Sequence, residues 1–331
     1  MSDSEAQAAV VAGTRAPRRI RVAAVRDYGI VFAFVALFIT LSIASDVFLT
    51  RANMVNLAFQ AAPIGIMACG GALVFIAGGF DLSVGAVAAF SGVIAAKAFA
   101  GAGLPMWPSF ILGALTGLGF GVGNGLLVTV ARVNAFIATL ASSIIIYGLA
   151  IAVTGGFLVS IDQESWTRLG LNQAFGINYP IYVWLAFALF CGFLLSRTTF
   201  GRYVYAAGGN AEAARLSGVR VDLVRLATFA ISGLSGGIAG IIIISQTSTA
   251  QADIGNAGYT FDAITAVVLG GVSILGGEGA IWRAVLGAFF LQMIRNGFNL
   301  LNVKPEYQSV FTGAILLAAV SLDAWARRTR T

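Results

Sequence analysis

Very few residues of this chain could take part in covalent chemistry. The sequence contains no histidine, which excludes a histidine-activated nucleophile and a histidine-ligated metal site. Gly233-Leu-Ser-Gly-Gly237 matches the G-x-S-x-G pattern of serine hydrolases, but there is no histidine to activate Ser235. Neither Lys97 nor Lys304 follows a glycine, as a phosphate-binding loop requires. We therefore predict no catalytic residue and no metal site, and any ATP would be bound by another subunit.

The composition is that of a polytopic membrane protein. Of 331 residues, 58% are hydrophobic and 10% are charged, whereas a soluble domain carries roughly 25% charged residues. The apolar runs are about 18–24 residues long, which suits membrane helices and not barrel strands of about ten residues. The net charge of +6 is concentrated in a few segments, so it does not indicate nucleic-acid binding. Cys69 and Cys191 lie inside apolar runs and are expected to be free.

Ten apolar segments predict an all-α bundle of about ten transmembrane helices. They are Tyr28–Ala44, Met54–Ala77, Leu82–Phe99, Trp107–Val130, Ala135–Thr154, Tyr179–Ser196, Val224–Ser245, Asp262–Leu275, Ala280–Leu301 and Tyr307–Trp325. The third and eighth are the weakest, and eight spans result if both are re-entrant. The membrane domain then covers 28–325, between a disordered cytoplasmic tail at 1–27 and a second cytoplasmic tail at 326–331.

The arginine distribution orients these segments, because cytoplasmic loops are enriched in Arg and Lys. With ten spans and the N-terminus inside, Arg132, a polar arm at 197–225 and the C-terminal arginines all lie in the cytoplasm. The loop at 155–178 becomes the main external loop. We therefore expect a multi-pass protein with both termini cytoplasmic.

The polar arm is the longest charged interruption between apolar segments, and it contains GGNAEAARLSGV at Gly208–Val219. Asn210 can cap a first helical turn, in which Glu212 suits the positive end of the helix dipole. Ala213, Ala214, Arg215 and Leu216 continue the helix, and Gly218 can end it in the left-handed conformation. The arm thus predicts one isolated helix of two turns, either a solvated loop or a docking element for a cytoplasmic partner.

This stretch resembles the cytoplasmic coupling segment of permease subunits of ribose/xylose-type ABC sugar importers. Three further stretches resemble the same family: GGFDLSVGAVAA at Gly78–Ala89, NGLLVTVARVNAFIATLA at Asn124–Ala141, and VVLGGVSILGGEGAIWRAVLGAFFLQMIRNGFNLL at Val267–Leu301. The resemblance implies a type II importer-like fold in the bacterial inner membrane. It also implies that the chain imports a monosaccharide of the ribose/xylose/galactose class by alternating access.

The resemblance further implies partners. A cytoplasmic ABC ATPase would bind ATP and Mg, so that this chain binds no cofactor itself. A periplasmic or lipid-anchored sugar-binding protein would deliver the substrate, and a second permease copy, identical or paralogous, would complete the pathway. The coupling residues implied are Asn210, Glu212, Ala213, Ala214, Arg215, Leu216 and Gly218. Within them Ala213, Ala214 and Leu216 are expected to bury against the ATPase.

Several polar residues inside the spans are candidates for the translocation path. Neutral amides, hydroxyls and aromatic rings recognise sugars, which favours Asn134, Phe136, Thr139, Asn296 and Asn299. Interhelical hydrogen bonding is the open alternative for all five. Structural roles are expected for Asp81, as the cap of a helix starting at Leu82, and for Asn124.

Glycines recur at four-residue spacing in two segments, at Gly113, Gly117 and Gly121, at Gly119 and Gly123, and again at Gly233, Gly237 and neighbours. Such spacing predicts close helix packing.

Alternatives to sugar import stay open. One is an ABC permease for nucleosides, a furanosyl signal molecule or branched-chain amino acids. Another is an ion-coupled transporter that uses Asp81, Asp262 or Glu278.

Overall fold

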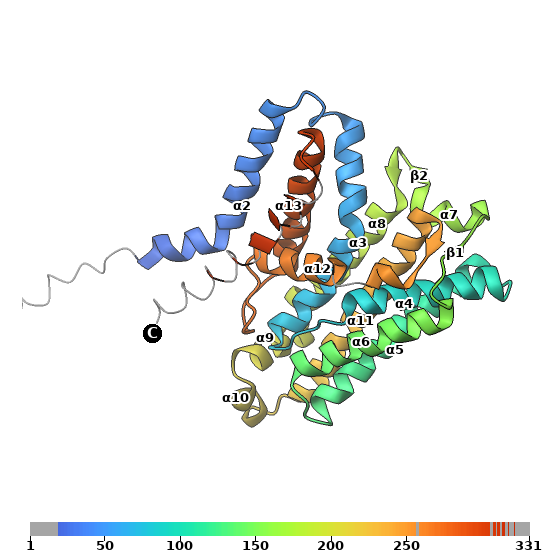
Figure 1. Ribbon diagram of the computed structural model, residues 1–331. Helices are drawn as coiled ribbons and strands as arrows, with labels where there is room; N and C mark the ends of the chain where they lie inside the picture. Colours follow the sequence, from blue (N-terminus) through green and yellow to red (C-terminus); the bar gives the residue numbers. More distant parts are fainter. Residues whose placement is uncertain are drawn as a thin grey trace, which may run out of the picture.

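The computed structural model describes residues 19–255 and 258–304, together with separate residues between 307 and 321. These parts form a helical bundle with two small sheets, whose strands lie at the side of the bundle away from α10 (Figure 1). The all-α prediction is confirmed.

The longer helices are α2 (Arg19–Ala44), α3 (Arg51–Ile76), α4 (Val84–Ala96), α5 (Met106–Thr129), α6 (Ala135–Thr154), α8 (Tyr179–Arg197), α11 (Val221–Thr247) and α13 (Ile281–Leu300). The shorter helices are α7 (Glu164–Leu171), α9 (Thr199–Gly209), α10 (Ala211–Leu216) and α12 (Gly258–Leu269). A π-helical turn at Lys97–Gly101 extends α4, and a 3-10 turn occupies Ala252–Gly255. Antiparallel pairs join β1 (Val159–Ser160) to β4 (Thr249–Ala250) and β2 (Gln173–Ala174) to β3 (Ile177–Asn178).

Six helices of the described chain are long and apolar enough to cross a membrane: α3, α4 with its π-helical turn, α5, α6, α8 and α11. Each coincides with a predicted segment. α12 has 12 residues, which is too short to span, in agreement with the weakness of the eighth predicted segment. Gln292, Arg295 and Asn296 lower the hydropathy of α13. The predicted count of about ten spans is therefore not confirmed, and its last segment, Tyr307–Trp325, lies mostly outside the described residues.

Two parts of the predicted layout differ from the structure. α2 begins at Arg19, so 19–27, assigned to a disordered tail, are helical, while 1–18 lie outside the described residues. The polar arm contains a second helix, α9, whose first turn is capped by Thr198, since Thr198 Oγ1 accepts a hydrogen bond from Gly201 N (3.3 Å). The helix α10 is therefore not isolated, because α9 leads directly into it.

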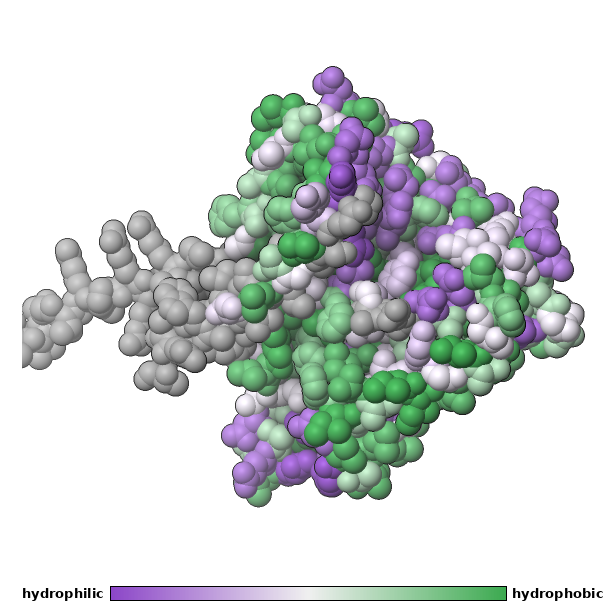
Figure 2. Space-filling view, viewed as in Figure 1, coloured by the Kyte–Doolittle hydropathy of each residue, from purple (hydrophilic) through white to green (hydrophobic). Residues whose placement is uncertain are grey.

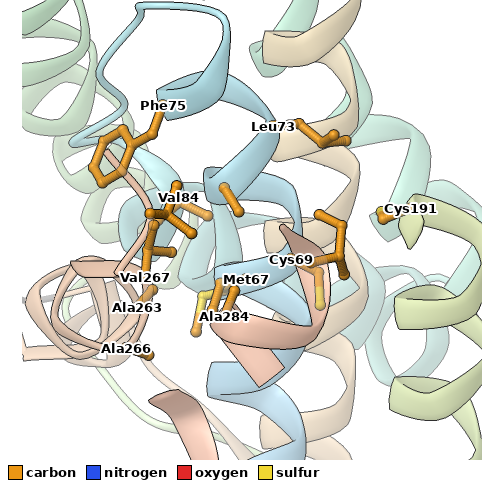
Figure 3. Packing of buried hydrophobic residues seen from close by; sticks show 14 of the residues in the cluster. Met67, Cys69, Leu73, Phe75, Val84, Cys191, Ala263, Ala266, Val267 and Ala284 are labelled. Carbon is orange, nitrogen blue, oxygen red and sulfur yellow. The ribbon is translucent and has the colours of Figure 1, made fainter. Parts of the chain in front are cut away.

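The centre of the bundle is α3, which is buried along most of its length because it is apolar on all sides. Figure 3 shows Met67 of α3 beside Ala263 and Val267 of α12, with Val84 of α4 close by. The two cysteines are free and buried, as predicted.

Two glycine rows on α5 have different roles. Gly117 and Gly121 face Gly233 and Gly237 of α11, and a Cβ at Gly121 would lie 2.9 Å from Gly233 Cα. This contact confirms the predicted close packing. The residues of α11 that match the serine-hydrolase pattern, Gly233 to Gly237, are part of this packing surface. A Cβ on the second row, at Gly119 or Gly123, would meet nothing within 4 Å.

Candidate coupling and translocation sites

The helix α10 forms as its local sequence predicts. Asn210 Oδ1 accepts hydrogen bonds from Glu212 N (3.1 Å) and Ala213 N (3.0 Å), which caps the first turn. Gly218 has a φ of +85°, the left-handed conformation that ends a helix. The predicted helix is thus confirmed, while its docking role stays a prediction.

The predicted docking face of α10 needs a correction. Ala214 is 6% exposed and belongs to the main core of this chain. Leu216 is 86% exposed, and Ala213, which lies three residues earlier on the same helix face, is exposed as well. A partner could therefore contact Ala213 and Leu216, whereas Ala214 holds α10 against its own bundle. α10 lies in the strongly polar lower-left corner of the view in Figure 2.

One carboxylate ties α10 to the α5–α6 loop. Asp222, in the first turn of α11, accepts hydrogen bonds from Arg215 Nη2 (3.0 Å) and from both terminal nitrogens of Arg132 (3.0 and 2.9 Å). The three side chains are at least 40% exposed, so each pair contributes about 0–1 kcal/mol. These ion pairs orient α10 more than they stabilise the fold.

The end of α9 meets α3 and the α12–α13 loop in what we call the glycine joint, formed by Gly208, Ile76 and Gly277. A Cβ at Gly208 would overlap the Ile76 carbonyl oxygen and lie 2.6 Å from Gly277 N. Gly277 N donates to Ile76 O (2.9 Å), and Tyr205 Oη donates to Gly279 O (2.7 Å). Burial raises the pKa of the Tyr205 phenol, so it stays a donor. The arm is therefore packed directly against the backbone of the central helix.

Asp81 is the centre of a buried network rather than the N-cap of α4. It is 5% exposed, and its Oδ1 accepts hydrogen bonds from Ser83 N (2.8 Å) and Ser83 Oγ (2.6 Å). Its Oδ2 accepts from Ser232 Oγ of α11 (2.7 Å). The helix begins at Val84, not at Leu82, and Ser83 occupies the cap position. Ser83 lies only two residues from Asp81, whereas Ser232 is 151 residues away and could not be recognised from the sequence.

Two of the predicted path residues of α6, Phe136 and Thr139, contact the α3–α4 loop. Asn134 Oδ1 caps the helix by accepting from Phe136 N (2.9 Å). The Phe136 ring is half exposed, with its centroid 5.7 Å from that of Phe80. Thr139 is buried, and its Oγ1 donates within its own helix and accepts from Leu82 N (3.1 Å). Its contacts are therefore structural, whereas Phe136 is open to a solute or a partner.

The predicted path residues of α13 contact other elements. Asn296 exchanges two hydrogen bonds with Asn53 of α3, at 3.1 and 2.7 Å, and both side chains are buried. Arg295 forms an ion pair with Asp262 of α12. Asn299 is exposed and does not share this pairing. The structure thus favours the interhelical alternative for Asn296 and does not bring it together with the α6 group.

A groove of about 730 Å³ runs between α5 and α6. It is lined by Thr116, Gly119, Phe120, Gly123, Asn124, Leu127, Val133, Ile137, Ala138, Ala141, Ser142 and Ile145. Sequence reasoning did not identify it, although the spacing of Gly119 and Gly123 was a signal of a helix groove. A second cavity of about 660 Å³ lies beside the start of α3, with Arg51, Asn56 and Asn178 in its lining.

Residues 53–320 match the family described as branched-chain amino acid transport system / permease component. The chain belongs to this permease family. It is 40% identical to the L-arabinose transport system permease protein AraH of Escherichia coli (strain K12), over 92% of each chain. It is 35% identical to the ribose import permease protein RbsC of the same strain, over 88% of this chain and 92% of the relative. The RbsC protein of Bacillus subtilis (strain 168) is 38% identical, over 87% and 89%. No solved structure matches the chain.

The matched region of the permease runs from the start of α3 through α13, so it contains the arm, the Asp81 network and the groove. Membership confirms the family resemblance drawn from GGNAEAARLSGV and the three other stretches.

Proposed function

We propose that this permease is the transmembrane subunit of an ATP-driven ABC importer for a monosaccharide of the ribose/xylose/galactose class. The observation that carries the proposal is the 40% identity to an L-arabinose permease over 92% of both chains. Ribose permeases at 35% and 38% identity support the same solute class. Because the family description names branched-chain amino acids, leucine is the appropriate competing solute.

The partners follow from the same proposal. A cytoplasmic ATPase binds ATP and Mg and carries out hydrolysis, so the permease itself is not an enzyme and holds no cofactor. A sugar-binding protein outside the inner membrane delivers the solute, and a second permease copy, identical or paralogous, faces the first. Transport proceeds by alternating access of the two permeases.

The proposed orientation puts α10 and both termini in the cytoplasm and 155–178 outside. The Arg132–Asp222 pair puts the α5–α6 loop beside the start of α11, while β1, in the 155–178 loop, pairs with β4 after the end of α11. The 27 residues of α11 separate these two ends by about 40 Å. We expect an Asp162→Cys variant without native cysteines to be labelled in intact cells. Labelling only after permeabilisation would show that the loop at 155–178 lies in the cytoplasm and that the proposed orientation is wrong.

Uptake by membrane vesicles that contain the assembled transporter tests the function. We expect accumulation of L-arabinose, D-ribose or a related sugar that requires ATP and the binding protein and resists an uncoupler. Uncoupler-sensitive uptake without ATP would favour an ion-coupled transporter. Competition by leucine alone would favour the amino-acid alternative.

We assign docking of the ATPase to the exposed face of α10. Leu216→Asp should leave the folded yield unchanged and release the ATPase, because the side chain is 86% exposed and can lose only contacts with a partner. Leu49→Asp is the matched control, since Leu49 is 56% exposed and lies in the α2–α3 loop. Normal co-purification and uptake in the Leu216 variant would exclude this docking face.

A further inference from the structure

The α5–α6 groove is lined by two largely buried residues, Ser142 and Asn124, each with one side-chain oxygen that no described group binds. Ser142 is 8% exposed, and its hydroxyl has no partner among the described residues. Asn124 is 2% exposed, and no described group donates to its Oδ1. Both residues line the groove. Neither atom is among the fully buried, unpartnered polar atoms of the described residues, so both are open to a molecule that enters the groove.

The hydrogen-bond network fixes the direction of the Asn124 amide. Ser83 Oγ has one proton, which it donates to Asp81 Oδ1 (2.6 Å). It must therefore accept from Asn124 Nδ2, at 2.7 Å, and the Asn124 carbonyl oxygen is left for the groove. Because the chain of bonds ends on a carboxylate, the network polarises the amide and strengthens that oxygen as an acceptor.

The shape and charge of the groove restrict what can bind there. Gly119 and Gly123 leave its α5 side open, and Phe120 is held edge-on to Phe90 with centroids 5.6 Å apart. Its volume of about 730 Å³ lies within the range of about 300–1,000 Å³ for small-molecule sites. None of its lining residues is charged, so it offers no ion pair to an amino acid or an ion.

We propose that the α5–α6 groove is a binding surface for the sugar in transit. Asn124 Oδ1 accepts a hydrogen bond from one sugar hydroxyl, and Ser142 Oγ exchanges a hydrogen bond with another. The open glycine row leaves room for the ring, and Phe120 offers an apolar wall. This assignment rests on the proposed monosaccharide function and identifies residues of this chain that contact the neutral solute.

Filling the groove tests its role. Gly123→Leu places a side chain in the groove without a clash in the described chain, and Gly192→Leu is the matched control on α8, where a Cβ also meets nothing within 4 Å. We expect both variants to assemble with the ATPase and the second copy. Sugar uptake at saturating binding protein should fall at least tenfold in Gly123→Leu and stay normal in Gly192→Leu.

Two outcomes would overturn the inference. Equal uptake by both leucine variants would mean that the groove meets only lipid. Loss of the two-copy assembly in Gly123→Leu would mean that a helix of the second copy fills it. Failure of the unmodified transporter to take up any pentose or hexose would instead reject the proposed function itself.

Ser142→Ala tests the chemistry of the contact. Loss of one hydrogen bond to a neutral group should lower uptake of the preferred sugar about threefold to tenfold. Uptake of the deoxy analogue that lacks the contacted hydroxyl should change less, so the ratio of the two rates should move toward one. A purely structural serine would lower both rates equally, and that result would contradict the assignment.

Discussion

Replacing Asn296 with leucine should destabilise the permease by about 2 kcal/mol. Asn296 and Asn53 are 7% and 8% exposed and exchange hydrogen bonds of 2.7 and 3.1 Å between α13 and α3. An interhelical hydrogen bond in a membrane protein contributes about 0.6 kcal/mol on average, so the two contribute about 1.2 kcal/mol. Asn53 Nδ2 keeps its bond to Phe48 O (2.9 Å), but its buried Oδ1 loses its donor, which adds about 1 kcal/mol.

A double-mutant cycle measures this pairing. Unfolding of the purified permease is followed for the unmodified protein, Asn53→Leu, Asn296→Leu and the double variant. Once one amide is gone, the other is only an unsatisfied group, so the double variant should be little worse than either single one, with a coupling energy of about 2 kcal/mol. Uptake per folded Asn296→Leu molecule should be normal. Additive losses of unfolding free energy would refute the pairing. Normal stability together with lost transport would indicate that Asn296 contributes to the translocation path.

Substitutions at two further contacts should have large effects. Gly208→Ala should reduce the folded yield or block transport because its Cβ would meet the backbones of Ile76 and Gly277. Gly209→Ala should be neutral, since a Cβ there meets nothing within 4 Å. Equal behaviour of the two variants would contradict close packing at the glycine joint. Asp262→Leu should cost about 2–3 kcal/mol in unfolding measurements, below the usual cost for a fully buried pair because Arg295 is 28% exposed. Adding Arg295→Leu should recover most of that loss, and no recovery would show that the ion pair is unimportant.

The spans could be predicted because each is specified by a continuous stretch of sequence. α6 matches its predicted bounds, Ala135–Thr154, since Asn134 caps its start and Gly155, with a φ of +67°, ends it. The same local rules predicted α10. α9 was missed because its apolar face, which includes Val204 and Ala207, is interrupted by glycines and an arginine. The stability of α9 comes from packing on the bundle, and such packing cannot be inferred from the local sequence.

The sites were less predictable because their partners are distant in sequence. Ser232 is separated from Asp81 by 151 residues, and Asn296 from Asn53 by 243. The residue types correctly indicated polar groups that need partners, as for Asn296 and Asn124. Which groups would pair and which would stay open depended on how the helices pack. Ala214 shows the same limit, since its side chain turns toward its own core rather than toward a partner.

The contacts of the arm and of the groove are continuous through the end of α3. Gly208 packs on Ile76, Arg225 Nε donates to Ala77 O (3.2 Å), and the loop that follows carries Asp81. Asp81 is linked through Ser83 to Asn124 in the groove. Because close packing at Gly208 leaves no space for independent motion, displacement of the arm must displace this loop or break these bonds. Linkage is reciprocal, so a sugar bound at Asn124 would bias the position of the arm as strongly as the arm biases the groove.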